Sequence, residues 1–153
     1  MRRKSAKSDE WERLVAAARE VSRNAHAPYS RLRIGAAIEA ADGTIYSGCN
    51  VENSSFGLTV CAERVALQCA VAAGARSFTR LAIYTSDAGP LSPCGACRQA
   101  LVEFSPDLAI RSVGRGGLQR DFELAKLLPR AFGWPFDCAQ GGPAGEASNQ
   151  PEG

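Results

Sequence analysis

The sequence predicts a single layered α/β domain. Strand-like segments alternate with amphipathic or alanine-rich segments of helical spacing, and this alternation is typical of a sheet covered by helices. The chain has 153 residues, 45% of them hydrophobic, which is enough for one domain with a buried core. From Trp134 onward Gly, Pro, Ser and Gln predominate and apolar residues are few. We therefore expect one domain over 1–133 and a disordered tail over 134–153.

The beginning of the chain predicts a helix followed by a hairpin. Apolar residues from Trp11 to Val21 recur at helical spacing, and Ser8 can cap the start of this helix. Segments 32–40 and 44–49 look extended. The short link Ala41-Asp42-Gly43 between them suits a hairpin.

Two further helices are predicted, and each begins at a cysteine. A loop over 50–60 leads into the helix 61–73, which is rich in alanine and ends before Gly74. A second helix, 94–104, follows a proline-containing loop and stops before Pro106.

The remaining elements complete the alternation. Segments with strand composition lie at 80–85, 108–113 and 118–122, and a short helix is expected over 123–128.

The charge pattern argues against large anionic partners. The formal net charge is only +2, so we expect neither a nucleic-acid nor a membrane partner. The first eight residues are polar and basic with no apolar run behind them. We therefore expect no signal peptide and no membrane span, and a cytoplasmic location.

Three cysteines and one glutamate have the spacing of a metal site. Cys61-Ala62-Glu63 and Pro93-Cys94-Gly95-Ala96-Cys97 place three thiols and one carboxylate at the two predicted helix starts. A structural zinc is closed by four protein ligands, whereas a catalytic zinc takes three and keeps one position for water. Three clustered cysteines therefore favour a catalytic zinc. The alternative is a structural zinc whose fourth ligand is one of Cys49, Cys69, Cys138 or His26.

Glu63 is the one carboxylate of these motifs, and it is not needed as a ligand if the three cysteines bind the metal. Positive charge at helix N-termini stabilises thiolates, and zinc lowers the pKa of a bound water to about 7. A carboxylate beside that water can act as a general acid and base. Arg64 and Arg98, next to Glu63 and Cys97, are available to offset the negative charge of three thiolates.

Together these motifs resemble the cytidine deaminase family, specifically its small homotetrameric nucleoside branch with an all-cysteine zinc site. Cys61 stands where the general zinc deaminase signature has His, which favours a free nucleoside over a polynucleotide as substrate. The resemblance covers roughly 27–133 and rests on Pro28-Tyr29-Ser30, Gly35-Ala36-Ala37, Gly48-Cys49-Asn50-Val51-Glu52-Asn53, Cys61-Ala62-Glu63-Arg64, Pro93-Cys94-Gly95-Ala96-Cys97-Arg98-Gln99 and Leu127-Leu128-Pro129.

The resemblance implies a fold and a reaction. The fold would be a three-layer α/β/α sandwich with a mixed five-stranded sheet. One zinc ion per subunit would be held by Cys61, Cys94 and Cys97, and the enzyme would deaminate cytidine and deoxycytidine hydrolytically in pyrimidine salvage. Activated water would attack C4 of cytosine while Glu63 takes its proton, protonates N3 and assists the departure of ammonia.

Other site residues are implied only by the resemblance. Asn50, Val51 and Glu52 correspond to substrate-binding positions, and alternation in an extended segment would direct Asn50 and Glu52 to the same side. Phe132 would reach into the active site of a neighbouring subunit, which makes a homotetramer with shared sites the expected assembly. Arg64 would hydrogen-bond the ligand thiolates.

Two positions depart from the family pattern. Leu32 stands where many relatives carry a Phe that packs near the pyrimidine, and Phe56 stands where many carry a Tyr. We expect a weaker pocket and not a different reaction, because Leu32 still supplies an apolar wall.

Two other functions remain open at this stage. A deaminase acting on another aminopyrimidine, such as a nucleoside antibiotic of the blasticidin type, would use the same zinc chemistry. A non-catalytic zinc-stabilised or nucleic-acid-binding module would need a fourth protein ligand or salt-dependent nucleic-acid affinity.

Overall fold

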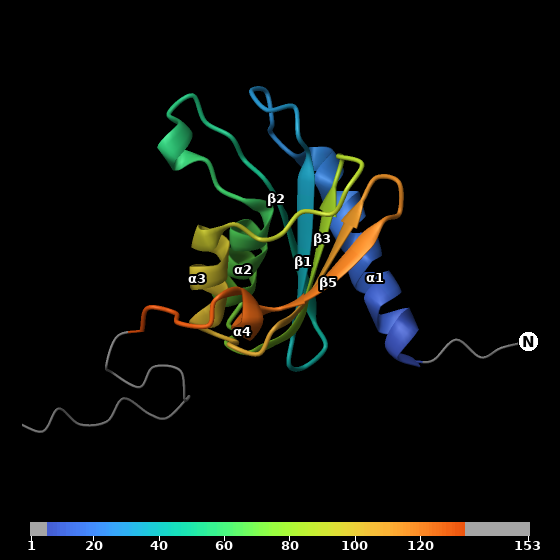
Figure 1. The fold of residues 1–153 in the computed structure, drawn as a ribbon, viewed down its shortest axis with the longest axis vertical. Coiled ribbons are helices and arrows are strands. Elements are labelled where there is room, and N and C mark those ends of the chain that lie inside the picture. The colour runs from blue at the N-terminus through green and yellow to red at the C-terminus, as the bar shows by residue number, and fades with distance from the viewer. Residues whose placement is uncertain (1–5, 134–153) are drawn as a thin grey trace, which may run out of the picture.

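The computed structural model describes residues 6–133, and these form a five-stranded sheet with helices on both faces (Figure 1). The predicted tail over 134–153 lies outside the described residues. The elements are, in chain order, α1 (Ala6–Val21), β1 (Ile34–Ala40), β2 (Ile45–Cys49), α2 (Ala62–Ala72), β3 (Phe78–Thr85), α3 (Gly95–Val102), β4 (Ala109–Gly114), β5 (Gln119–Glu123) and α4 (Leu124–Leu127).

The sheet is mixed, as the family resemblance implied. Its strand order is β2-β1-β3-β4-β5, and only β3 and β4 pair in parallel. The helix α3 connects these two strands, as the crossover between parallel strands requires. Because α2 precedes β3 and α3 precedes β4 on the same face, both helices begin at the same end of the sheet.

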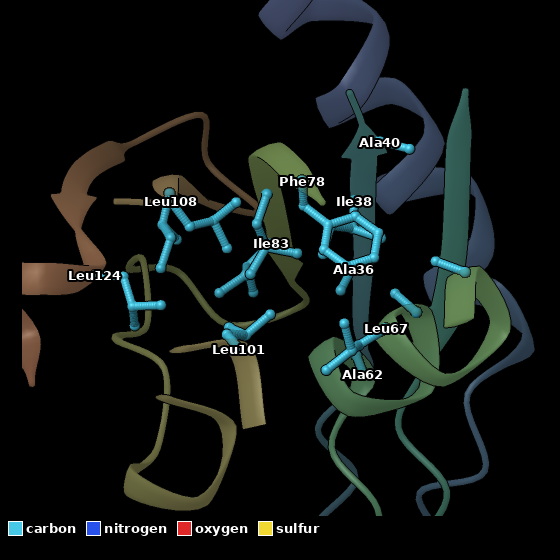
Figure 2. Packing of buried hydrophobic residues seen from close by; sticks show 14 residues of the cluster. Ala36, Ile38, Ala40, Ala62, Leu67, Phe78, Ile83, Leu101, Leu108 and Leu124 are labelled. Carbon is cyan, nitrogen blue, oxygen red and sulfur yellow. The ribbon is translucent and has the colours of Figure 1, made fainter. Parts of the chain in front are cut away.

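The helices divide the core into two clusters. On one face α1 packs Trp11, Leu14 and Ala18 against Ala37 and Ala82 of the sheet. On the other face α2 and α3 cover the larger cluster, in which Ile38, Ile83 and Leu101 are fully or almost fully buried (Figure 2). Figure 1 shows α1 on one side of the sheet and α2 and α3 together on the other. The expected three layers are confirmed.

Two glycines allow the helices to approach the sheet closely. A Cβ atom on Gly35 of β1 would lie 1.9 Å from the carbonyl oxygen of Ala18 in α1. A Cβ atom on Gly48 of β2 would lie 2.4 Å from the amide nitrogen of Ala66 in α2. Both positions therefore exclude any side chain.

Element boundaries differ from the predicted ones where side chains pair with the backbone. The expected strand over 32–40 begins only at Ile34, because the Leu32 amide donates to Ser30 Oγ and the Leu32 carbonyl accepts from Asn50 Nδ2. Helix α1 begins at Ala6, so Ser8 lies inside it and the prediction of a Ser8 cap was wrong.

In the described part of the chain, no helix is long and apolar enough to cross a membrane.

Candidate active site

The three cysteines meet where α2 and α3 begin. Cys61 is the residue before α2 and Cys94 the residue before α3, and both have extended backbone angles. Cys97 lies in the first turn of α3 and is buried. Neither helix start is capped by a side-chain hydrogen bond, so free N–H groups and the positive ends of two helix dipoles face the sulfur atoms.

The geometry of this cluster fits zinc. The Sγ atoms of Cys61 and Cys94 are 3.8 Å apart, those of Cys94 and Cys97 are 3.4 Å apart, and all three sulfurs lie within 4.8 Å of one another. Zn–S bonds of about 2.3 Å in a tetrahedron place sulfurs about 3.8 Å apart. Among the described residues no fourth His, Cys, Asp or Glu joins the cluster. Three ligands leave one coordination position open, as in catalytic zinc sites.

Two of the three thiols have pKa values shifted in opposite directions by their contact with each other. A hydrogen bond from the Cys97 thiol, helped by the Arg64 guanidinium, lowers the pKa of the Cys61 thiol to about 5. The same hydrogen bond raises the pKa of the Cys97 thiol above its usual range, together with burial. Zinc would replace these thiol protons and hold the three sulfurs as thiolates.

Glu63 lies in the first turn of α2, two residues after Cys61. Its side chain is buried, with 6% of the residue exposed, and burial raises the pKa of this carboxyl above its usual range. It nevertheless lines the same cavity as Cys61 and Cys94. A buried carboxyl with a raised pKa beside a metal site is suited to accept and pass on a proton.

Arg64 and Arg98 differ in their relation to the sulfur atoms. Arg64 Nη2 donates to the Thr59 carbonyl at 3.1 Å and to Cys61 Sγ at 3.9 Å. Its Nε is the one buried side-chain nitrogen or oxygen without a partner in the described residues, and thiolate charge nearby would stabilise it. Arg98 instead donates hydrogen bonds to the Ser92 hydroxyl and to the carbonyls of Pro93 and Leu127. The suggestion that Arg98 offsets thiolate charge directly is therefore not supported.

A cavity of about 320 Å³ opens beside the cluster. This volume is at the lower end of the range for small-molecule sites. Cys61, Cys94 and Glu63 form its chemically reactive side. The lining also includes an aliphatic wall that suits a flat heterocycle: Leu32, Ile34, Ile83 and Leu91.

Asn50 and Glu52 both line the cavity, as alternation in an extended segment predicted. Asn50 is buried, and its side chain clamps the backbone before β1: Oδ1 accepts from the Ile34 amide at 2.8 Å, and Nδ2 donates to the Leu32 carbonyl at 2.9 Å.

Glu52 clamps the neighbouring loop in the same manner. It accepts hydrogen bonds from the Tyr29 amide at 2.8 Å, from the Ser30 amide at 3.3 Å and from the Ser30 hydroxyl. The Ser30 hydroxyl in particular holds the pKa of the Glu52 carboxyl below its usual range. Glu52 thus stays ionised and shapes the cavity rim.

Val51 and Phe132 do not reach the cavity of their own chain. Val51 is 44% exposed, and its amide and carbonyl both pair with Val60. Phe132 is 71% exposed, and its carbonyl accepts from Gln99 Nε2. Within one chain the structure gives neither residue a contact with the site. Phe56 also lies on the surface, where its ring meets that of Tyr29 edge to face at 5.5 Å.

Besides Ile34 and Ile83 in the strands, four loop residues of the cavity were not assigned a role from the sequence: Ser30, Thr59, Leu91 and Ser92. All four lie in loops, where no periodicity marks a buried side. The available signal was indirect, because Ser30 belongs to the Pro28-Tyr29-Ser30 motif and Ser92 precedes the Pro-Cys ligand motif.

A sheet flanked by helices, with a three-thiol zinc cluster and a buried acid beside one cavity, defines a zinc-dependent hydrolase of the deaminase class. The family model for the cytidine and deoxycytidylate deaminase zinc-binding region matches residues 8–112. The chain therefore belongs to the cytidine and deoxycytidylate deaminase family, and the predictions of this family, an enzyme and a zinc cofactor are confirmed.

Named relatives and solved structures agree with this assignment. A cytidine deaminase of Sporosarcina psychrophila is 46% identical over 122 residues, which cover 79% of this chain and 90% of that protein. A probable cytidine deaminase of Dictyostelium discoideum is 49% identical over 126 residues, covering 81% and 84%. The crystal structure of cytidine deaminase from Burkholderia pseudomallei matches with a TM-score of 0.76 and 44% identity, over 79% of this chain and 98% of that one.

Proposed function

We propose that this enzyme converts cytidine and deoxycytidine into uridine and deoxyuridine, with water consumed and ammonia released, in pyrimidine salvage. One observation carries the proposal: the buried Glu63 carboxyl lies in the same small cavity as the ligands Cys61 and Cys94. The relatives named cytidine deaminase support this choice of substrate.

Cys61, Cys94 and Cys97 would hold the zinc ion, which would lower the pKa of a bound water to about 7 and so provide a nucleophile at neutral pH. The protein's own groups move the protons. Glu63 accepts one proton from the water that attacks C4 and delivers it to N3 of the ring. It then takes the second proton from the new C4 hydroxyl and delivers it to the amino group, so that the C4–N bond breaks, the C4 carbonyl forms and ammonia leaves. Its burial suits these steps, because burial raises the pKa of the carboxyl and so makes it a stronger proton acceptor.

The remaining cavity walls support recognition of a nucleoside. The aliphatic wall around Leu32 and Ile83 excludes water from the faces of a pyrimidine. Asn50 retains one amide N–H and one carbonyl lone pair, and the Glu52 carboxylate accepts three of about four possible hydrogen bonds. Both can therefore bind sugar hydroxyls.

The assembly belongs to the same proposal. A homotetramer with shared active sites would give the exposed Phe132 ring a neighbouring cavity to enter and would cover Val51 and Phe56. Arg64 would hydrogen-bond the thiolates, and the enzyme would act in the cytoplasm on free nucleosides, without a nucleic-acid partner.

The test replaces the proton carrier and leaves the metal ligands intact. Glu63→Gln keeps the side-chain volume but cannot accept and deliver the proton, so we expect kcat to fall by at least 10²-fold with one zinc ion retained per subunit. Ammonia release and absorbance change would be followed with cytidine, deoxycytidine, dCMP and blasticidin S, and zinc would be quantified in the same sample.

The outcomes separate the possible functions. Wild-type turnover of both free nucleosides supports salvage, whereas turnover of blasticidin S alone redirects the proposal to another aminopyrimidine. Full activity of the Glu63→Gln enzyme would contradict the assigned role of Glu63.

A further inference from the structure

Arg98 joins two parts of the chain that are distant in sequence. Its Nε donates to the Pro93 carbonyl at 2.8 Å and its Nη2 donates to Ser92 Oγ at 3.0 Å. Its Nη1 donates to the Leu127 carbonyl at 3.0 Å, where α4 ends. One planar guanidinium therefore fixes both the residues before ligand Cys94 and the end of α4.

The loop that Arg98 holds forms part of the cavity. Leu91, Ser92 and Cys94 line the cavity, and none of them lies in a helix or strand. At the other end of this loop the Leu91 amide donates to Ser112 Oγ of β4 at 3.0 Å. The loop before Cys94 is thus held by side chains from two elements, Arg98 of α3 and Ser112 of β4.

The residue next to Arg98 holds the same C-terminal segment. Gln99 Nε2 donates to the Phe132 carbonyl at 2.8 Å. Helix α3 therefore ties the segment 127–132 at both ends, and it does so from the two residues that directly follow ligand Cys97.

We propose that Arg98 is a positioning residue that directs Cys94 toward the metal and makes the metal geometry depend on the docking of segment 127–132. The proposal rests on the zinc site described above and adds a role that is not direct charge compensation. The fork geometry is essential, because a guanidinium donates from three separate nitrogens in one plane, whereas an ammonium carries its three donors on a single nitrogen and does not reach the same three acceptors.

The experiment compares Arg98→Lys with wild type and with Arg76→Lys. Arg76 Nη1 donates to the carbonyls of Val71 and Ala75 at 2.8 and 2.9 Å, at the opposite end of α2 from Cys61. Arg76→Lys therefore removes guanidinium hydrogen bonds to backbone carbonyls, as Arg98→Lys does, but at a place away from the metal site. The readouts are zinc release to a chelating dye, the absorption spectrum of the Co²⁺-loaded protein, and kcat and KM for cytidine.

For Arg98→Lys we expect at least tenfold faster zinc release, an altered cobalt spectrum, and a kcat that falls more than KM rises. For Arg76→Lys we expect wild-type metal readouts even if thermal stability falls. Equal metal readouts in the two variants would overturn the proposal. If wild type fails to deaminate cytidine while only Arg98→Lys changes the metal readouts, the proposed function falls and the positioning role stands.

A milder variant covers the case in which Arg98→Lys does not fold. Ser92→Ala removes one of the three partners of Arg98 and leaves the guanidinium in place. We expect zinc release between the wild-type and Arg98→Lys rates, or clearly above the wild-type rate if Arg98→Lys cannot be purified. Wild-type zinc release in Ser92→Ala would then count against the positioning role.

Discussion

Leu32 has two functions in the structure. Its side chain belongs to the aliphatic wall of the cavity, and its carbonyl accepts the Asn50 amide that holds the start of β1. Only the side chain changes on substitution, so the packing against a pyrimidine can be varied while the Asn50 contact is kept.

Leu32→Phe should therefore strengthen substrate binding. An aromatic edge contact contributes about 0.5–1.5 kcal/mol beyond area burial, which corresponds to a KM for cytidine lowered roughly two- to tenfold with little change in kcat. Steady-state kinetics would measure this, with Leu32→Met as the control of similar volume. An unchanged KM, or a collapse of kcat, would show that Leu32 does not face the ring.

At the scale of single residues, the sequence predicted the chemistry better than the contacts. Spacing predicted that Cys61, Cys94 and Cys97 form one cluster, and the structure brings their sulfurs together, while the catalytic role of Glu63 stays a prediction. The contacts of Arg98 were not predicted, because consecutive helical residues point about 100° apart and adjacency to Cys97 does not give the partners of Arg98. The backbone clamps made by Asn50 and Glu52 depend on tertiary contacts that spacing does not contain.

At the scale of elements, packing of α2 on β2 sets where Glu63 lies. Gly48 is the contact point, and a Cβ atom there would meet backbone atoms of Val65 and Ala66, which cannot move independently of the helix. The helix that carries Glu63 therefore sits at a distance from the sheet that only glycine allows.

Gly48→Ala should be destabilising by about 1–3 kcal/mol, because overpacking forces the helix away from the strand. Gly57→Ala is the control, since a Cβ atom at Gly57 would meet nothing within 4 Å, and we expect a change within about 0.5 kcal/mol. Urea unfolding followed by circular dichroism would compare the midpoints. Equal midpoints would mean that α2 can shift without cost.

Element types were predicted well, while their pairing was not. Periodicity and capping located every strand and α-helix within a few residues, because these signals are local. The mixed sheet came only through the family resemblance, and the strand order and the parallel pairing of β3 with β4 were not predicted, since register is decided by contacts between distant segments.

At the scale of the whole molecule, none of the three cysteines belongs to either hydrophobic cluster of the described residues, although Ala62, next to Cys61, belongs to the larger one. The cores are built from the faces of the sheet, whereas the three sulfurs lie at the ends of α2 and α3. The fold therefore does not depend on zinc in the way that a small zinc finger does.

Removal of zinc with a chelator at neutral pH should abolish activity and lower the melting temperature without loss of secondary structure. At free zinc a thousandfold above its dissociation constant, metal binding stabilises the native state by about 4 kcal/mol. Circular dichroism and thermal melts would be recorded before chelation, after it, and after zinc is restored. Complete unfolding on chelation would instead favour a structural zinc.

The hairpin turn between β1 and β2 has a practical consequence. Within the turn, Asp42 Oδ1 accepts from the Thr44 amide, and Gly43 adopts a φ of 86°. The residues of the turn are exposed. The strand β1 separates it from the cavity by about 20 Å. An epitope tag or a fluorescent reporter inserted at this turn would leave the catalytic end of the molecule untouched.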